Sequence, residues 1–167
     1  ASDEVKPDEG SLLPLWTFVN EPTKKKHVTA LCFNPSYPDM LTVGYGSYNF
    51  AKQQAGGIAC FTLKNPSFPE YHIDTESGVM CLDFHPEAVN LMVVGFYDGS
   101  VAVYDMHSGD LTVPTYKATA LTGKHSDPVW QVKWQPDDLE KHKNFYSVSS
   151  DGRITSWTLR YAELHHH

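Results

Sequence analysis

Short runs in which apolar and polar residues alternate recur along the whole chain. In 129–134 (VWQVKW), for example, Trp130, Val132 and Trp134 alternate with the residues between them. A period of two is typical of a β-strand, whose successive side chains point to opposite faces of a sheet. Pro, Gly, Asn and Asp bound these runs, and helical periodicity is almost absent. The pattern therefore predicts an all-β fold.

Three of these runs repeat one another, and each ends at a proline. They are HVTALCFNP up to Pro35, GVMCLDFHP up to Pro86, and PVWQVKWQP up to Pro136. The prolines are 51 and 50 residues apart, and apolar residues recur at matching positions within the runs. We therefore expect the first strands of three repeated units over 28–33, 79–84 and 129–134.

Each of these strands begins a unit with the same continuation. In the first unit the later strands are MLTVGYGS, GIACFTL and an outer segment such as SFPEYHI. Four short strands in a repeat of about fifty residues are typical of a β-propeller blade. The sequence thus predicts three four-stranded antiparallel blades, about twelve strands, at approximately 27–73, 78–121 and 124–159.

Three blades are fewer than the roughly four to eight that close a ring, so we expect a partial propeller over 11–160. The segment 14–18 (PLWTF) is predicted to be the outer strand of a preceding blade. Residues 1–10 are acidic and contain Pro7 and Gly10, which predicts a flexible leader. We interpret 161–167 as a tail whose final histidines are the remnant of a purification tag.

Two Asp-Gly pairs, Asp98-Gly99 and Asp151-Gly152, each lie between two apolar strands. This dipeptide favours a two-residue hairpin turn in which both central residues have positive φ. We expect both pairs to form such turns.

The third unit resembles the Gly-His … Ser-x-Asp-Gly … Trp pattern of WD repeats. It supplies His125, Ser149, Asp151 and Trp157. The resemblance implies a buried chain of hydrogen bonds in which the Asp accepts from the His, the His contacts the Ser, and the Ser contacts the indole N–H. Ser147 lies on the same strand face as Ser149, so the choice between the two serines stays open. Because buried polar groups need partners, such a network would fix the geometry of the blade.

The other two units depart from this pattern. The second unit keeps Asp98-Gly99 but has Tyr104 in place of the Trp and no matching His, and the first replaces the tight turn with GSYNFAKQQAGG. We therefore expect the full network only in the third blade. The long loop of the first unit needs another explanation, since long loops on a rigid scaffold are often binding sites. Its candidate partner-binding residues are Tyr48, Asn49, Phe50 and Lys52.

Catalytic interpretations of the same residues fail on geometry. His125, Ser126 and Asp127 are consecutive, so they cannot point at one another as nucleophile, base and orienting group. Gly44 and Gly46 lack the third glycine and the Lys-Ser/Thr of a phosphate-binding loop. We predict no catalytic, cofactor-binding or metal-binding residues, and no enzyme activity.

Charge and cysteine content narrow the possible partners. The net charge of -7 disfavours nucleic acid binding, which needs an excess of Lys and Arg. No run approaches the ~20 apolar residues of a membrane helix. The three cysteines are odd in number and lie among apolar neighbours, as expected for free thiols in a reducing, intracellular compartment.

Whole phrases of the sequence carry a more specific resemblance. VGYGSYNF, LKNPSFPEY, GFYDGSVAVYD and GKHSDPVWQVKWQPDD are similar to the propeller of axonemal dynein intermediate chains, the outer-arm type in particular. The similarity runs from about Asp3 to Leu159. It implies a WD-repeat propeller in a non-catalytic subunit of a ciliary motor, located in the cytoplasm, the cytoskeleton and the axoneme of the cilium or flagellum.

The same resemblance implies partners. They are the tail of a dynein heavy chain and a second intermediate chain, with light chains and microtubules reached through the intact complex. No membrane and no nucleic acid are expected. The alternative is a WD-repeat substrate receptor or peptide-binding scaffold of another complex.

Overall fold

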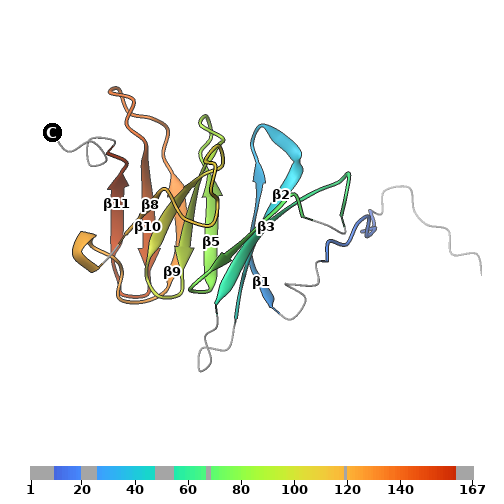
Figure 1. Ribbon diagram of the computed structural model, residues 1–167, viewed down its shortest axis with the longest axis horizontal. Coiled ribbons are helices and arrows are strands. Elements are labelled where there is room, and N and C mark those ends of the chain that lie inside the picture. The colour runs from blue at the N-terminus through green and yellow to red at the C-terminus, as the bar shows by residue number, and fades with distance from the viewer. Residues whose placement is uncertain (1–9, 20–25, 48–54, 67–68, 119, 161–167) are drawn as a thin grey trace, which may run out of the picture.

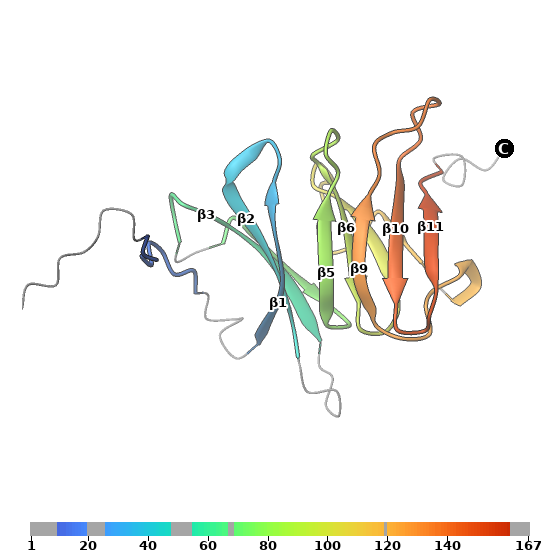
Figure 2. The ribbon, with the colours of Figure 1, turned by 180° about the vertical axis from the view of Figure 1, so that it is seen from behind.

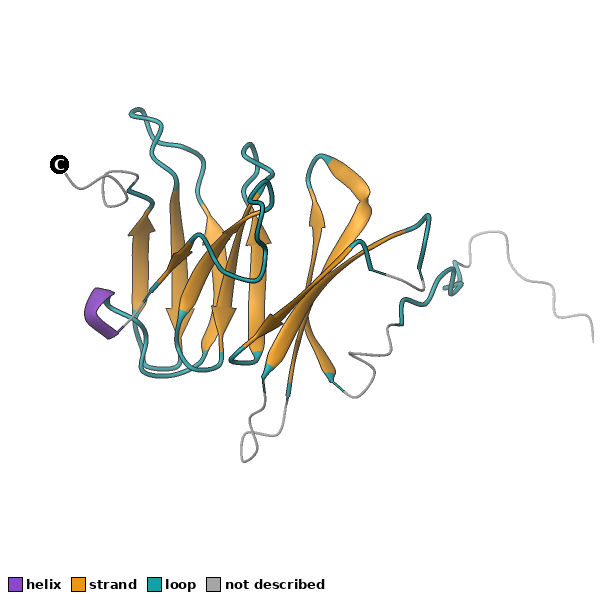
Figure 3. Ribbon diagram, in the orientation of Figure 1, coloured by secondary structure: helices purple, strands orange, loops and turns teal. Residues whose placement is uncertain are grey.

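The computed structural model describes residues 10–19, 26–47, 55–66, 69–118 and 120–160. Within these ranges the chain forms strands and one short 3-10 helix, η2 (Ala120–Thr122) (Figure 3). The strands are β1 (His27–Asn34), β2 (Tyr37–Gly46), β3 (Gly56–Thr62), β4 (Tyr71–Thr75), β5 (Val79–Phe84), β6 (Leu91–Phe96), β7 (Val101–Asp105), β8 (Tyr116–Lys117), β9 (Val129–Trp134), β10 (Asn144–Ser149) and β11 (Ile154–Thr158).

The strands form three antiparallel meanders, ordered β1-β2-β3-β4, β5-β6-β7-β8 and β9-β10-β11. Figures 1 and 2 show the three sheets side by side, which is how propeller blades lie. The all-β fold is confirmed, and the predicted first strands coincide with β1, β5 and β9 to within one residue. The prediction of about twelve strands is one too high for the described residues, because the third sheet has three strands there.

The predicted outer strand at 14–18 is wrong, since the chain has no regular secondary structure there. A strand needs a neighbour to satisfy its backbone hydrogen bonds, and no described strand pairs with this segment. Leu15 is 71% exposed, whereas Phe18 packs on Phe61 of β3 with ring centroids 5.6 Å apart. The segment is therefore held by an apolar side-chain contact rather than by a sheet.

The prediction of two-residue turns at the Asp-Gly pairs is also wrong. Gly99 and Gly152 have φ of 88° and 83°, but neither aspartate has positive φ. The backbone N–H of Gly99 donates to the carbonyl of Phe96, and that of Gly152 to Ser149, so each loop contains three residues. Each aspartate instead accepts a hydrogen bond from the amide two residues later, which suits an ordinary right-handed conformation. Only the glycine is left to take the left-handed position.

Two apolar cores hold the sheets together. The first lies between the first and second sheets and the other between the second and third sheets. Glycines set the approach distance: a Cβ on Gly44 would lie 2.5 Å from Val79 Cγ1, and one on Gly95 would lie 2.6 Å from Val129 Cγ1. In the first and second blades, a glycine in the second strand therefore allows the first strand of the next blade to pack closely.

Candidate functional site

A buried chain of four polar side chains ties the third blade together; we call it the blade lock. His125 is 1% exposed and lies in the connection before β9. Its Nδ1 is 3.0 Å from Asp151 Oδ2 in the β10–β11 turn, and its Nε2 is 2.7 Å from Ser147 Oγ of β10. Trp157 of β11 donates from Nε1 to the same Ser147 Oγ at 2.8 Å. The blade lock thus joins two strands, a turn and the incoming connection.

The serine of the blade lock is Ser147, and its assignment to Ser149 is wrong. Ser147 lies mid-strand opposite Val132 and Thr155 and is fully buried. A register shift separates Val148 from Ser149, so the two serines do not hold equivalent positions in the sheet. The hydroxyl of Ser149 donates to the Asp127 carbonyl and accepts from the Asp151 amide. Ser149 therefore supports the turn beside the blade lock.

The partners of His125 fix its tautomer. The Asp151 carboxylate and the indole N–H each have one role, because an ionised carboxylate only accepts and an indole only donates. Nδ1 therefore carries the proton that His125 donates to Asp151. Nε2 accepts from the Ser147 hydroxyl, whose oxygen in turn accepts from Trp157. Both ring nitrogens of His125 are therefore paired within the blade lock.

The surroundings of Asp151 favour its charged form. Burial opposes ionisation, but the backbone amides of Arg153 and Ser126, the His125 ring and the Arg153 guanidinium all donate to the carboxylate. Together these donors hold the pKa of the Asp151 carboxyl well below its usual range. The charged Asp151 carboxylate thus accepts hydrogen bonds from the turn, from the connection before β9 and from His125 of the blade lock.

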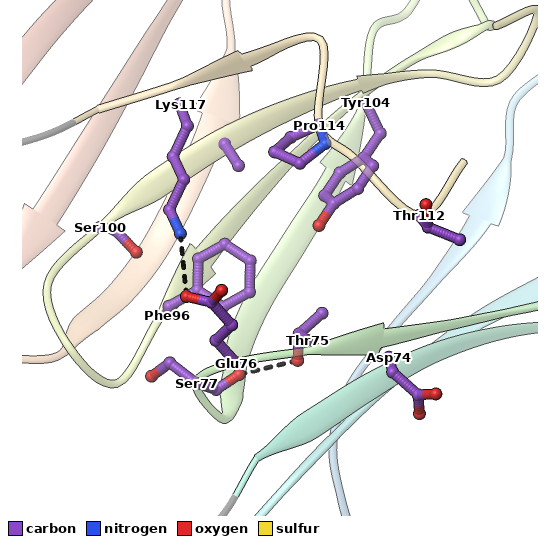
Figure 4. A pocket seen from close by; sticks show the side chains of 11 residues that line it. Asp74, Thr75, Glu76, Ser77, Phe96, Ser100, Tyr104, Thr112, Pro114 and Lys117 are labelled. Atoms are coloured by element: carbon purple, nitrogen blue, oxygen red, sulfur yellow. Dashed lines mark hydrogen bonds and ion pairs between the residues drawn. The ribbon is translucent and has the colours of Figure 1, made fainter. Parts of the chain in front are cut away.

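The second blade has a cavity where the third has its blade lock. Thr75 stands four residues before β5, as His125 stands before β9, and Val94 takes the place of Ser147. A hollow of about 90 Å³ remains beside Thr75. Figure 4 shows Tyr104, the counterpart of Trp157, with its hydroxyl directed between Phe96 and Thr75.

Asp98, the counterpart of Asp151, has other partners in the second blade. It accepts from the amide and hydroxyl of Ser100, and Lys124 Nζ lies 3.6 Å from it. Burial opposes ionisation, but Ser100 and then Lys124 lower the pKa of the Asp98 carboxyl. The turn is retained in this blade without a histidine.

A second buried histidine, which the sequence analysis missed, links two blades. His85 follows β5 and is fully buried; its Nδ1 accepts from the amides of Glu87 and Ala88 at 3.0 and 2.8 Å. Its Nε2 therefore carries the proton and donates to Asp137 Oδ1 of the third blade at 2.9 Å. A lysine, Lys143, pairs with the same carboxylate.

The ion pair with Lys143 lowers the pKa of the Asp137 carboxyl against the opposing effect of burial, and His85 adds to the lowering. His85 precedes Pro86 and Asp137 follows Pro136, so both partners flank the repeated prolines. This spacing is the signal that could have identified the pair.

The candidate partner-binding loop cannot be placed, because Tyr48, Asn49, Phe50 and Lys52 lie outside the described residues. Across the described ranges, no group of three or more His, Cys, Asp or Glu side chains could hold a metal ion. Cys32, Cys60 and Cys81 are free thiols. None of the helices in the described part of the chain is long and apolar enough to span a membrane.

Comparison with known families supports the propeller. Residues 68–105 match the WD40 family, described as WD domain, G-beta repeat. The match runs from the end of the first blade through β5, β6 and β7, so it covers the blade that lacks the histidine. The WD repeat is therefore recognisable from strand and turn pattern without the blade lock.

Curated relatives are similar over almost the whole chain. The flagellar outer-arm dynein 78 kDa intermediate chain of Chlamydomonas reinhardtii is 57% identical over 98% of this chain. Dynein axonemal intermediate chain 1 of Rattus norvegicus is 54% identical over 99%, and ciliary dynein intermediate chain 2 of Heliocidaris crassispina is 54% identical over 98%. The chain spans 23–24% of the length of these relatives. Homologues of this chain are thus axonemal dynein intermediate chains, and its own three sheets, with their WD repeat, form part of a WD propeller.

Proposed function

We propose that this chain is part of a non-catalytic scaffold subunit of an axonemal dynein, whose propeller binds the tail of a dynein heavy chain. The observation that carries this proposal is the 54–57% identity, over nearly the whole chain, to axonemal dynein intermediate chains. The names of these relatives, axonemal, ciliary and flagellar, indicate a location in the axoneme. A second intermediate chain would be a direct partner, and light chains and microtubules would be reached through the complex.

The architecture supports a scaffold role. Buried polar ties within and between the blades, such as His125 to Asp151 and His85 to Asp137, hold the sheets in fixed positions. Fixed blades present their connecting loops as a preorganised surface, which lowers the entropic cost of binding a partner. Both buried histidines are fully engaged in these ties, so neither is available as a general base.

The binding proposal is tested with purified full-length protein and a recombinant heavy-chain tail. We expect the two to co-elute in size-exclusion chromatography at micromolar concentration, and an unrelated WD-repeat protein to elute separately as the control. Capture from ciliated cells followed by mass spectrometry addresses the alternative. Recovery of heavy chain and tubulin supports the scaffold role, whereas recovery of ligase or chromatin subunits without heavy chain indicates a WD-repeat substrate receptor.

The non-catalytic proposal is tested separately. The full-length protein should show no nucleotide hydrolysis of its own. ATPase activity that copurifies with it and disappears after a point mutation in this chain would overturn the scaffold role.

A further inference from the structure

A hollow of about 360 Å³ lies at the junction between the first and second blades. It opens at Tyr37 and His107, which are both exposed. Its walls are largely apolar: Met40, Phe84, Val89, Met106 and Leu111. A concave, mostly apolar site with a few polar groups is typical of a binding pocket. We call it the junction pocket.

Four polar side chains of the junction pocket already have hydrogen-bond partners. The hydroxyls of Thr42 and Tyr71 lie 3.2 Å apart, and the Asn34 side-chain amide donates to the Val89 carbonyl. Asn90 donates to Asp105 at 2.9 Å. A polar ligand would have to displace these bonds, so the pocket favours an apolar side chain. Its size admits one or two such side chains.

The next junction shows why this hollow exists. Trp134 holds the position of Phe84 in the following blade, and His85 holds that of Asn34. There the larger rings pack edge to face, with centroids 5.1 Å apart, and the Trp134 indole donates to the Asp83 carbonyl. The smaller Phe84 and Asn34 leave the equivalent space open. Both walls of the junction pocket belong to complete four-stranded sheets, so the pocket is a product of side-chain size.

Several carboxylates lie near the junction pocket, although none of its lining residues is acidic. The backbone amide of Glu70 donates to the Cys60 carbonyl at 2.7 Å, and Asp39 adjoins Met40 in the chain. Burial raises the pKa of the Cys60 thiol, and the charges of Glu70 and Asp39 add to that effect. Asp105 contacts Asn90, and Asp110 adjoins Leu111. Against these, the adjoining loops contribute Lys64 and His107. An occupant with positive charge beside its apolar group would therefore be complementary.

We propose that the junction pocket binds an apolar side chain, leucine, methionine or phenylalanine, from a lysine- or arginine-rich segment of a partner protein. The pocket supplies burial for the anchor, and the nearby carboxylates attract the basic residues beside it. Two methionines in the walls allow the pocket to adapt to anchors of different shape. This assignment rests on the proposed scaffold role, which requires a protein partner.

The test uses the full-length protein and a fluorescent peptide that has one leucine flanked by lysines in a Gly-Ser background. Fluorescence anisotropy should show saturable binding that weakens with added salt. Replacing the leucine by alanine should weaken binding roughly tenfold or more. Replacing the lysines by glutamates should abolish binding up to about millimolar peptide.

Variants locate the binding. Phe84→Trp copies the residue that fills the next junction and should also weaken binding roughly tenfold or more. Phe96→Trp, a buried change in the same sheet that lines a different hollow, is the matched control and should leave the affinity unchanged. Glu70→Lys changes an exposed residue near the pocket, so it does not disturb the core; it should weaken binding several-fold and reduce its salt dependence.

Peptide binding that survives both Phe84→Trp and Glu70→Lys would place the interaction elsewhere and overturn the proposal. So would a failure of every basic apolar peptide to bind, or cross-linking of the pocket rim to another segment of the same protein. These outcomes leave the scaffold role intact if the heavy-chain tail still co-elutes. Loss of that co-elution while peptides still bind would instead count against dynein as the complex.

Discussion

The first and second blades carry a leucine and a phenylalanine at equivalent positions of their first strands, but the pair is exposed in the first blade and buried in the second. Leu31 and Phe33 of β1 are 62% and 55% exposed, whereas Leu82 and Phe84 of β5 are 8% and 4% exposed. The residues are equivalent by sheet register, since Leu31 pairs with Val43 as Leu82 pairs with Val94. The face that carries Leu82 and Phe84 packs on the first blade. No described sheet covers the corresponding face of the first blade.

The comparison shows that a blade does not bury its own apolar face. Each face is covered only when a neighbouring sheet packs on it, as in repeat proteins generally. The third blade follows the same rule, since Val132 and Trp134 are each 3% exposed where they meet the second blade. We therefore predict that a further sheet packs on the exposed apolar residues of the first blade in the full-length protein.

The largest expected effect is the difference in stability cost between Phe84→Ala in the second blade and Phe33→Ala in the first. In the 167-residue chain, Phe84→Ala should lower the free energy of unfolding by about 3–5 kcal/mol, because it leaves a cavity between two sheets. Phe33→Ala should cost less than about 1 kcal/mol, because little of the ring is buried. Urea denaturation followed by circular dichroism measures both. In the full-length protein the cost of Phe33→Ala should rise toward that of Phe84→Ala, and equal costs already in the short chain would contradict the comparison.

The blade lock offers a second contrast, between the third blade and the second. His125→Ala and Ser147→Ala should each cost about 1–3 kcal/mol, since each leaves a buried polar partner unpaired. The double variant should cost clearly less than the two single changes together. The equivalent pair in the second blade, Thr75→Ala and Val94→Ala, should be additive within about 0.5 kcal/mol. Additivity in both blades would mean that the hydrogen bonds of the blade lock contribute nothing jointly.

We expect a smaller difference between the two turn aspartates in how stability depends on pH. The folded-state pKa of Asp151 and of Asp98 lies below the ordinary value of 3.8, so the unfolded chain binds more protons at low pH. Their contribution to stability is fully present above about pH 5 and is lost as the pH falls. Asp151→Asn should flatten the acid slope of the melting temperature more than Asp98→Asn, because Asp151 has more donors. Melting scans from neutral pH to pH 3 measure this, and identical slopes would contradict it.

The smallest effect separates the two serines. Ser149→Ala removes a half-buried hydroxyl from the turn and should cost no more than about 0.5 kcal/mol. Ser147→Ala removes the only hydroxyl that joins His125 to Trp157 in the blade lock and should cost several times as much. A larger loss for Ser149→Ala in urea denaturation would restore the serine that the sequence pattern favoured.

Local sequence patterns were enough to predict the blades and most of the blade lock. Strand patterns, the repeated prolines and the spacing of His125, Asp151 and Trp157 are local features, because a period of two and a tight turn depend on a few neighbouring residues. These features placed β1, β5 and β9 correctly and identified three of the four side chains of the blade lock. They also carried the resemblance to the axonemal dynein intermediate chains.

Features that depend on a second sheet or on exact register emerged only in the folded chain. The shift beside Ser149 selects Ser147, and the packing of two blades brings His85 to Asp137, 52 residues apart. The absence of a pairing strand among the described residues leaves 14–18 without sheet structure. In each case the local sequence is compatible with more than one structure. Contacts between residues distant in sequence determine which structure forms, because burial and hydrogen bonding are satisfied only in the assembled fold.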